Sequence, residues 1–190
     1  MVWIDLEMTG LEVERHVIVE IACIVTDSQL VTIDDGIDIV VHPEPDALER
    51  MDDFVRTMHT KSGLLEEMQR STTDLKTAGS QTLEYVRSHV PSPRTAPVCG
   101  NSIGVDRRFL DHYLPELDQY LHYRSIDVSS IKELCRRWYP AIYKKRPSKN
   151  EAHRALGDIL ESIEELRYYR DAMFIKEPTE SEAAAPEPTA

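Results

Sequence analysis

Cysteine is scarce in this sequence, and its scarcity limits the classes of protein to which the chain can belong. The three cysteines, Cys23, Cys99 and Cys135, lie far apart in the chain and form no C-x-x-C pair. An odd number of widely spaced cysteines argues against a disulfide framework and against a thiolate zinc site. We therefore expect a protein of a reducing, intracellular compartment.

Basic residues are also few relative to acidic ones. Lysine and arginine number 22 against 34 aspartates and glutamates, which gives a formal net charge of −12. Nonspecific binding to a long duplex depends on the neutralisation of many phosphates by basic side chains. The composition therefore argues against binding to long duplex nucleic acid by charge alone.

Long hydrophobic runs are missing. The most apolar stretch, residues 17–25, contains Glu20 and is about half as long as the roughly 20 residues that a membrane-spanning helix needs. No basic or apolar segment precedes Val2, so no signal peptide is visible. We expect a soluble cytoplasmic protein that does not associate with a membrane.

The length of the chain fits one compact domain. A protein of 190 residues is close to the usual size of a single domain. Residues 176–190 are rich in glutamate, proline and alanine and contain no large apolar side chain. Ordering such a segment costs entropy that no core contact offsets. We expect a domain over residues 1–175 and a disordered acidic tail over residues 176–190.

The pattern of apolar residues predicts an α/β fold. Short runs of β-branched residues predict a meander of three strands, and the later segments alternate between helical periodicity and short buried strands. This order predicts a sheet with mixed strand directions. The predicted strands are 2–7, 16–26, 30–42 with a break at 34–36, 96–100 and 123–127. The first predicted helix begins at residue 47 and has Leu48, Met51, Phe54 and Val55 on one apolar stripe. The further predicted helices are 64–69, 81–89, 105–113, 130–139 and 155–173.

Two carboxylates lie on one face of the first predicted strand. Side chains alternate along a strand, so Asp5 and Glu7 point to the same side, with their Cα atoms about 6.6 Å apart. Both can then reach one cation or a pair of cations. The alternative is an exposed strand end with two solvated acids.

Further candidate groups occur at the starts of two helices. Asp106 follows the strand at 96–100 and falls in the first turn of the next helix, where it either enters a crevice at the strand ends or complements the helix dipole. His153 and Asp158 are five residues apart, so they would lie about 140° apart on one regular helix. Because a basic, proline-containing segment at 144–150 precedes His153, that histidine can sit at a flexible helix entrance with Asp158 fixed on the helix. Each of them can alternatively be an ordinary surface residue.

These five residues, in this order, resemble the catalytic set of the DEDDh exonucleases. The closer resemblance is to the oligoribonuclease family within that superfamily, and it covers residues 1–175. It rests on the segments WIDLEMTGL at 3–11, MHTKSGL at 58–64, CGNSIGVDRRFL at 99–110 and YRSIDVSSIKELCRRW at 123–138. The resemblance implies a ribonuclease H-like mixed five-stranded sheet flanked by helices, a homodimer, and 3′-to-5′ hydrolysis of very short RNA, dinucleotides especially, to nucleoside 5′-monophosphates.

The resemblance also implies a metal centre. Asp5, Glu7, Asp106 and Asp158 would hold two divalent ions, and hard oxygen ligands favour Mg²⁺ or Mn²⁺ over zinc. His153, with an ordinary pKa near 6.5, would accept the proton of the attacking water. Tyr123 is sometimes regarded as catalytic in such enzymes, but a phenol of ordinary pKa is better suited to donate a hydrogen bond.

The same resemblance suggests how a dinucleotide is held. Leu11 would wedge between the bases, Phe54 and Tyr123 would stack on them, and Tyr123 would come from the partner subunit. Relatives often have tryptophan where Phe54 stands. The groups around the 5′ phosphate would be His59, Ser102, Arg124 and Ser129.

Each of these residues also has a plainer explanation. Leu11 and Phe54 can be core residues, His59 a helix-end histidine and Arg124 a surface ion-pair partner. The serines at 129 and 130, or Asp127, can cap the following helix.

Two other functions compete with this one. A related nuclease would trim longer RNA or proofread DNA, and a binding module would hold nucleotides without cleaving them. The second is disfavoured because a binder has no need of a cluster of mutually repelling acids.

Overall fold

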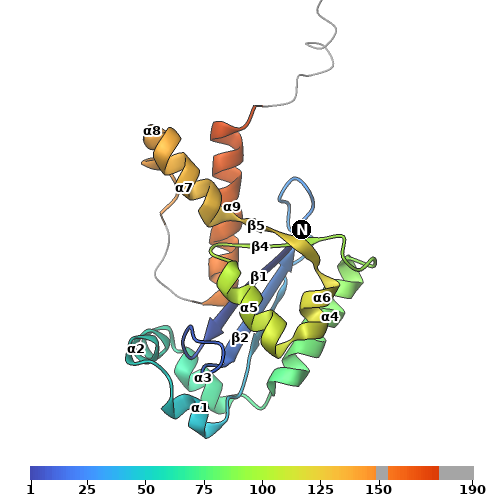
Figure 1. The fold of residues 1–190 in the computed structure, drawn as a ribbon, viewed down its shortest axis with the longest axis vertical. Coiled ribbons are helices and arrows are strands. Elements are labelled where there is room, and N and C mark those ends of the chain that lie inside the picture. The colour runs from blue at the N-terminus through green and yellow to red at the C-terminus, as the bar shows by residue number, and fades with distance from the viewer. Residues whose placement is uncertain (149–153, 176–190) are drawn as a thin grey trace, which may run out of the picture.

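The computed structural model describes residues 1–148 and 154–175. In that part of the chain the strands and helices alternate after an initial meander (Figure 1). The strands are β1 (Val2–Met8), β2 (Ile18–Val25), β3 (Ile37–Val40), β4 (Pro97–Gly100) and β5 (His122–Asp127). The helices are α1 (Pro45–Glu49), α2 (Asp53–Ser62), α3 (Leu64–Arg70), α4 (Leu75–His89), α5 (Gly104–Tyr113), α6 (Pro115–Tyr120), α7 (Val128–Trp138), α8 (Pro140–Tyr143) and α9 (Ala155–Met173).

The five strands form one mixed sheet in the order β3-β2-β1-β4-β5. The first three strands pair antiparallel, and β4 and β5 add to β1 in parallel. The predicted meander and the predicted mixed sheet are therefore confirmed. Parallel addition follows from the crossover helices, because α4 leads back to β4 and the α5–α6 pair leads back to β5.

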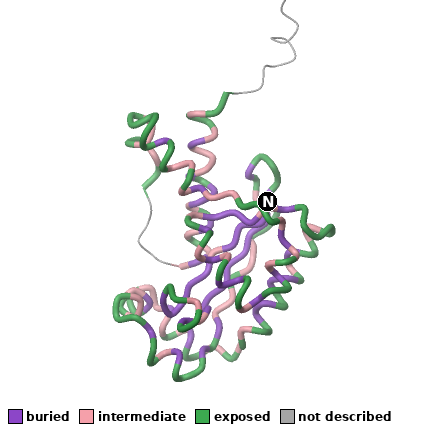
Figure 2. The backbone as a smooth tube through the Cα atoms, in the orientation of Figure 1, coloured by how far each residue is buried: buried purple, intermediate pink, exposed green. Residues whose placement is uncertain are grey.

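Helices cover both faces of the sheet (Figure 1), and its strands β1 and β2 are largely buried between them (Figure 2). The side chains of β1 alternate between the two faces. Val2, Ile4 and Leu6 belong to the apolar core under α4, α5 and α6. Trp3 belongs to the second core, under α7 and α9. The next two residues on Trp3's face are Asp5 and Glu7, so β1 presents its carboxylates to the α9 side.

Two details of the α1–α2 region differ from the prediction. The helix expected from residue 47 is interrupted at 50–52, which makes α1 and α2 separate helices. The interruption rotates Phe54 off the apolar stripe: Leu48 and Val55 pack against a third small core, whereas the Phe54 side chain is 79% exposed. Its position on the stripe was therefore a wrong prediction.

Other boundaries shift because local signals compete. The helix expected at 81–89 already begins at Leu75, where the Asp74 side chain accepts a 2.6 Å hydrogen bond from the backbone N–H of Thr77. The short helices α6 and α8 were not predicted, although Pro115 and Pro140 occupy their first turns, a position that proline favours. The strand expected at 30–42 shortens to β3, with turns at 27–36 before it.

Within residues 1–148 and 154–175, no helix combines the length and apolar character required to cross a bilayer. The acidic tail predicted at 176–190 lies outside the described residues.

Candidate active site

Three carboxylates from two elements meet on the α9 face of the sheet. Asp5 and Glu7 come from β1, and Asp158 comes from the first turn of α9, which packs across β1 and β2. Each offers an oxygen atom, and the three oxygens lie within 4.8 Å of one another. Residues more than 150 positions apart in the chain thus form one acidic cluster, which contains three of the four predicted ligands.

Asp106 contacts β1 at the edge of the strand that faces β4. β4 pairs with β1 only at Val2 and Trp3, so the following part of β1 has an edge that β4 does not cover. The first turn of α5 fills this space, and Asp106 Oδ1 accepts a 3.0 Å hydrogen bond from the backbone N–H of Leu6. This bond fixes Asp106 between the positions of Asp5 and Glu7 along the strand.

Burial raises the pKa values of Glu7 and Asp106. The pKa of Glu7 is raised to about 8, first by desolvation and then by the charges of Glu20, Asp158 and Asp106, while Arg154 opposes them. Burial likewise raises the pKa of Asp106 to about 7, against the lowering effect of the backbone hydrogen bonds that it accepts. A bound cation would favour the ionised forms of Glu7 and Asp106, because its positive charge offsets the cost of burying these anions.

The donor set also fits a hard divalent cation. All four predicted ligands are carboxylates, and the group of close ligand atoms found in the described chain contains carboxylates alone. Oxygen-only sites suit Mg²⁺ and Mn²⁺, whereas zinc favours nitrogen and sulfur. The residues are therefore suitable for the metal that the sequence suggested.

Sequence reasoning missed a buried ion pair beside the cluster. Glu20 lies directly opposite Glu7 in the β1–β2 pairing and is fully buried. Arg154 Nε donates to Glu20 Oε1 at 2.8 Å, the backbone N–H of Ala155 donates to Glu20 Oε2 at 3.1 Å, and Arg154 also binds Glu67. Glu20 thereby fixes the start of α9, one turn before Asp158. An acid inside an otherwise apolar strand was the signal that could have revealed it.

Comparisons with known proteins agree with this geometry. The chain matches the exonuclease family model over residues 2–166. It is 55% identical to the oligoribonuclease of Corynebacterium diphtheriae, over 96% of this chain and 87% of that protein. It is 56% identical to the oligoribonuclease of Rhodococcus jostii, over 94% of this chain and 89% of that protein. The chain belongs to the oligoribonuclease family. It is accordingly a nuclease.

Solved structures show the same fold beyond the oligoribonuclease family. E. coli exonuclease I in complex with a dT13 oligonucleotide superposes with a TM-score of 0.64 at 16% identity, over 89% of this chain and 40% of that chain. Exonuclease I of Methylocaldum szegediense gives a TM-score of 0.61 at 17% identity. At this identity the likeness concerns the fold alone, and it confirms the ribonuclease H-like sheet that the resemblance implied.

The residues that the oligoribonuclease resemblance assigned to the bases are on the surface. Leu11 lies in the loop between β1 and β2 with its side chain 63% exposed, and Phe54 is at the start of α2. Neither is a core residue, so the plainer explanation for both is wrong. Their exposure leaves two large apolar side chains facing solvent, in two segments that contact one another.

Two of the residues predicted around the 5′ phosphate lie together. The hydroxyl of Ser102 donates to that of Ser129 at 3.4 Å, and the Asp127 carboxylate accepts from the Ser129 hydroxyl at 2.6 Å. Asp127 also accepts from the backbone N–H of Ser129 and is the N-cap of α7. Of the alternatives for this segment, Asp127 is thus the cap, and Ser130 is not.

His59 and the β5 residues occupy other surroundings. The His59 ring is fully buried, 2.9 Å from the Met8 carbonyl oxygen through Nε2 and 3.9 Å from Glu7 Oε2 through Nδ1, so it is no ordinary helix-end histidine. Tyr123 and Arg124 begin the edge strand β5, and the guanidinium of Arg124 lies 5.1 Å from the centre of the Tyr123 ring.

The strand register separates Tyr123 from the acids of its own chain. Val2 pairs with Val98, and Val98 pairs with Ser125, so Tyr123 precedes the level of Val2 on the sheet. Asp5 and Glu7 lie toward the other end of β1. His153, the predicted base, lies outside the described residues.

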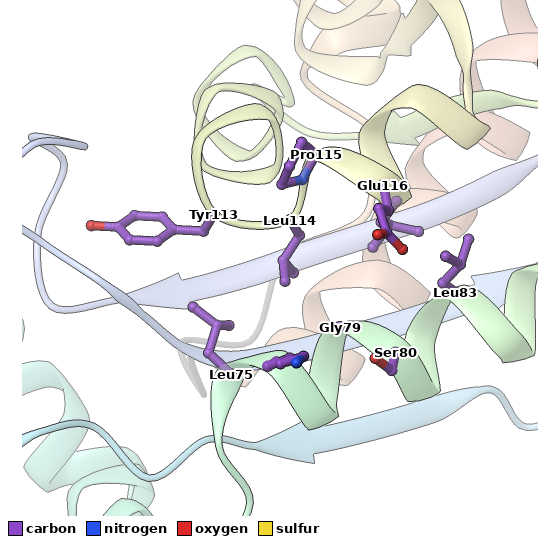
Figure 3. A pocket seen from close by; sticks show the side chains of 10 residues that line it. Leu75, Gly79, Ser80, Leu83, Tyr113, Leu114, Pro115 and Glu116 are labelled. Carbon is purple, nitrogen blue, oxygen red and sulfur yellow. The ribbon is translucent and has the colours of Figure 1, made fainter.

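A separate cavity lies away from these acids. It has a volume of about 420 Å³ and opens between α4 and the junction of α5 and α6, at the far end of α5 from Asp106 (Figure 3). Its lining is mainly leucine, proline and glycine. It therefore lacks the group of acids that marks the β1–α9 site.

Proposed function

We propose that this chain is a 3′-to-5′ exoribonuclease that hydrolyses very short RNA, dinucleotides especially, to nucleoside 5′-monophosphates. The observation that carries the proposal is the meeting of Asp5 and Glu7 with Asp158, with Asp106 bound to the amide of Leu6 between them. Membership of the oligoribonuclease family supports the substrate class, since the relatives carry that name.

The four carboxylates, in this proposal, hold two divalent ions, Mg²⁺ or Mn²⁺. Bound ions of this kind supply Lewis acidity for phosphodiester hydrolysis. Glu7 and Asp106 have raised pKa values without a metal, so they must release protons to become ligands. The Leu6 amide holds Asp106 in one orientation, and Glu20 with Arg154 holds the first turn of α9 and therefore Asp158.

His153 is the proposed general base. It directly precedes Arg154, whose guanidinium is fixed by two buried or half-buried glutamates. The imidazole would take the proton from the attacking water at neutral pH. Tyr123 would donate a hydrogen bond from the partner subunit of a homodimer.

We infer that separate groups of side chains bind the bases and the 5′ phosphate of the substrate. Leu11 and Phe54 would contact the bases, and Ser102, Ser129, His59 and Arg124 would surround the 5′ phosphate. An acidic protein has little electrostatic attraction for a long polymer, so a short substrate enclosed at both ends suits its charge.

The decisive experiment follows hydrolysis of a 5′-labelled diribonucleotide with Mg²⁺ or Mn²⁺ and with EDTA. We expect monophosphates with either ion and no turnover with EDTA. Asp106→Asn keeps an oxygen for the Leu6 N–H, so it should fold normally and lose activity; His153→Ala should also be inactive. Asp111→Asn, an exposed acid on the same helix α5, is the matched control and should be fully active. Full activity in both the Asp106 and His153 variants would refute the mechanism.

Rates on substrates of other lengths test the alternatives. A dimer should be cleaved much faster than a heptamer or single-stranded DNA. Equal rates would favour a nuclease that trims longer ends, and tight dinucleotide binding without hydrolysis under any divalent ion would favour a binding module.

A further inference from the structure

The loop that carries Leu11 is held by contacts within itself and with α5. This loop, residues 9–17, connects β1 to β2. The backbone N–H of Thr9 donates to the Val17 carbonyl at 3.0 Å, and the N–H of Val17 donates to the Thr9 hydroxyl at 3.0 Å. From α5, the Tyr113 hydroxyl lies 2.7 Å from the His16 carbonyl oxygen. The loop is therefore a defined structure that presents Leu11 to solvent.

The loop contains a buried histidine. The His16 ring is fully buried, and its Nδ1 accepts a 3.1 Å hydrogen bond from the backbone N–H of Glu12. Because Nδ1 accepts, the hydrogen of the neutral ring is on Nε2. Within the described chain Nε2 has no hydrogen-bond partner, and it faces Asp52 Oδ1 at 3.7 Å.

Asp52 connects His16 to the segment that carries Phe54. Asp52 is the N-cap of α2, two residues before Phe54, and its backbone N–H donates to the Thr9 carbonyl at 3.2 Å. A Cβ atom on Gly10 would lie 2.4 Å from His16 Cε1 and 2.7 Å from Asp52 Oδ2. The backbone next to Leu11 is thus enclosed between the His16 ring and the Asp52 carboxylate.

We propose that His16 and Asp52 are positioning residues that fix Leu11 relative to Phe54, so that the two side chains are preorganised for the bases of a dinucleotide. The inference rests on the proposed function, because it takes both side chains to be base contacts. Neither His16 nor Asp52 touches the reacting phosphate. Their effect is on substrate binding, since contacts that must first be ordered contribute less affinity.

The test measures KM and kcat for a diribonucleotide in wild type and in conservative variants. His16→Asn keeps an acceptor for the Glu12 N–H and removes the donor that faces Asp52, and Asp52→Asn removes the charge at a half-exposed position. We expect each to raise KM roughly tenfold, with kcat changed by less than about twofold. The double variant should raise KM no more than either single one, because both break the same contact. The matched control is Asp53→Asn, an exposed acid next to Asp52, with unchanged KM.

A substrate with one base separates positioning from general damage to the fold. The methyl ester of uridine 5′-monophosphate offers no second base, so its KM should be nearly the same in wild type, His16→Asn and Asp52→Asn. His16→Gln, which keeps a donor toward Asp52, should recover part of the KM for the diribonucleotide. An equal increase in KM for both substrates, or additive effects in the double variant, would overturn the inference.

Leu11→Ala and Phe54→Ala distinguish failure of the inference from failure of the proposed function. If these two variants raise KM while the His16 and Asp52 variants do not, the positioning role is wrong and the proposed function stands. If they leave KM unchanged, the base contacts are wrong and the inference is overturned with them. Absence of diribonucleotide hydrolysis by wild type would refute the proposed function itself.

Discussion

At the scale of single residues, the site buries acids whose ionised forms are costly there. Glu7 is buried among Glu20, Asp158 and Asp106, and its pKa of about 8 measures the cost of its ionisation. The position of Glu7 follows from the alternation of β1, which is a local property of the sequence. The cost does not, because it depends on helices that fold across the strand from distant parts of the chain.

This cost predicts that Glu7→Gln stabilises the metal-free protein in alkaline solution. Glu7 has an ordinary pKa of 4.5 when unfolded and about 8 when folded, so the folded state binds the extra proton between these values. The contribution of Glu7 to the free energy of unfolding is therefore fully present below pH 4.5. It is lost as the pH rises from 4.5 through 8. Glutamine has no such loss, so with EDTA at pH 8.5 the variant should be more stable by on the order of 2 kcal/mol.

Thermal unfolding at pH 5 and at pH 8.5 checks this. The melting temperatures of wild type and Glu7→Gln should be close at pH 5 and should separate at pH 8.5. With Mg²⁺ or Mn²⁺ added, wild type should gain more stability than the variant. A lower melting temperature for Glu7→Gln at both pH values in EDTA would contradict the prediction.

At the scale of elements, the start of α9 depends on a buried ion pair. Removing Arg154 leaves Glu20 as an uncompensated buried charge, which typically costs about 3 to 5 kcal/mol. Arg154→Met should therefore lower stability strongly in urea unfolding, and Glu20→Gln in the same chain should restore a large part of it. Arg137→Met, which breaks an exposed pair with Glu133, should cost less than about 1 kcal/mol. Equal effects of the two arginine substitutions would contradict this account.

Two helical glycines offer a matched pair of opposite predictions. A Cβ on Gly79 in α4 would lie 2.3 Å from Leu114 Cδ2, whereas a Cβ on Gly157 in α9 would meet open space. Alanine should therefore destabilise at position 79 by about 1 to 3 kcal/mol through overpacking. At position 157 it should stabilise by up to about 1 kcal/mol through helix propensity. Denaturant midpoints decide both, and a gain at position 79 would show that the Leu114 side chain can move aside.

The elements also show how far the sequence could predict this fold. The strands and the long helices were predictable because alternation and helical periodicity are written within each segment. The split between α1 and α2 was not, because the apolar stripe continues across residues 50–52 and only packing of the loop at Thr9 against Asp52 reveals the break. Local context left Asp5, Glu7 and Asp106 each with a plainer alternative. Only their order together with His153 and Asp158 made them candidates. The pairing of Glu20 with Arg154 was not predictable, because it joins residues 134 positions apart.

At the scale of the whole molecule, β5 and α7 carry exposed aromatic residues that bear on the proposed homodimer. Tyr123 is 73% exposed, and Trp138 at the end of α7 is 66% exposed. Tyr123 lies at the end of the sheet away from Asp5 in its own chain. In the proposed homodimer, a tyrosine of one chain completes the site of the other.

Mixing two inactive variants tests this arrangement. Asp106→Asn and Tyr123→Ala should each be inactive, but exchange of subunits should produce mixed dimers with one intact site. Activity should recover to about a quarter of that of wild type, since half of the dimers are mixed and each has one working site of two. Light scattering after size exclusion should give twice the 21.8 kDa mass of the chain. No recovery after exchange would assign Tyr123 to the site of its own chain, or to none.

The early end of β4 leaves the Leu6 amide facing a carboxylate where a sheet would normally supply a carbonyl. The resonance of that amide proton in a nuclear magnetic resonance spectrum will therefore move as Asp106 gains or loses charge. A titration with protons or with magnesium can be followed at this one backbone position in ¹⁵N-labelled protein, without a substrate.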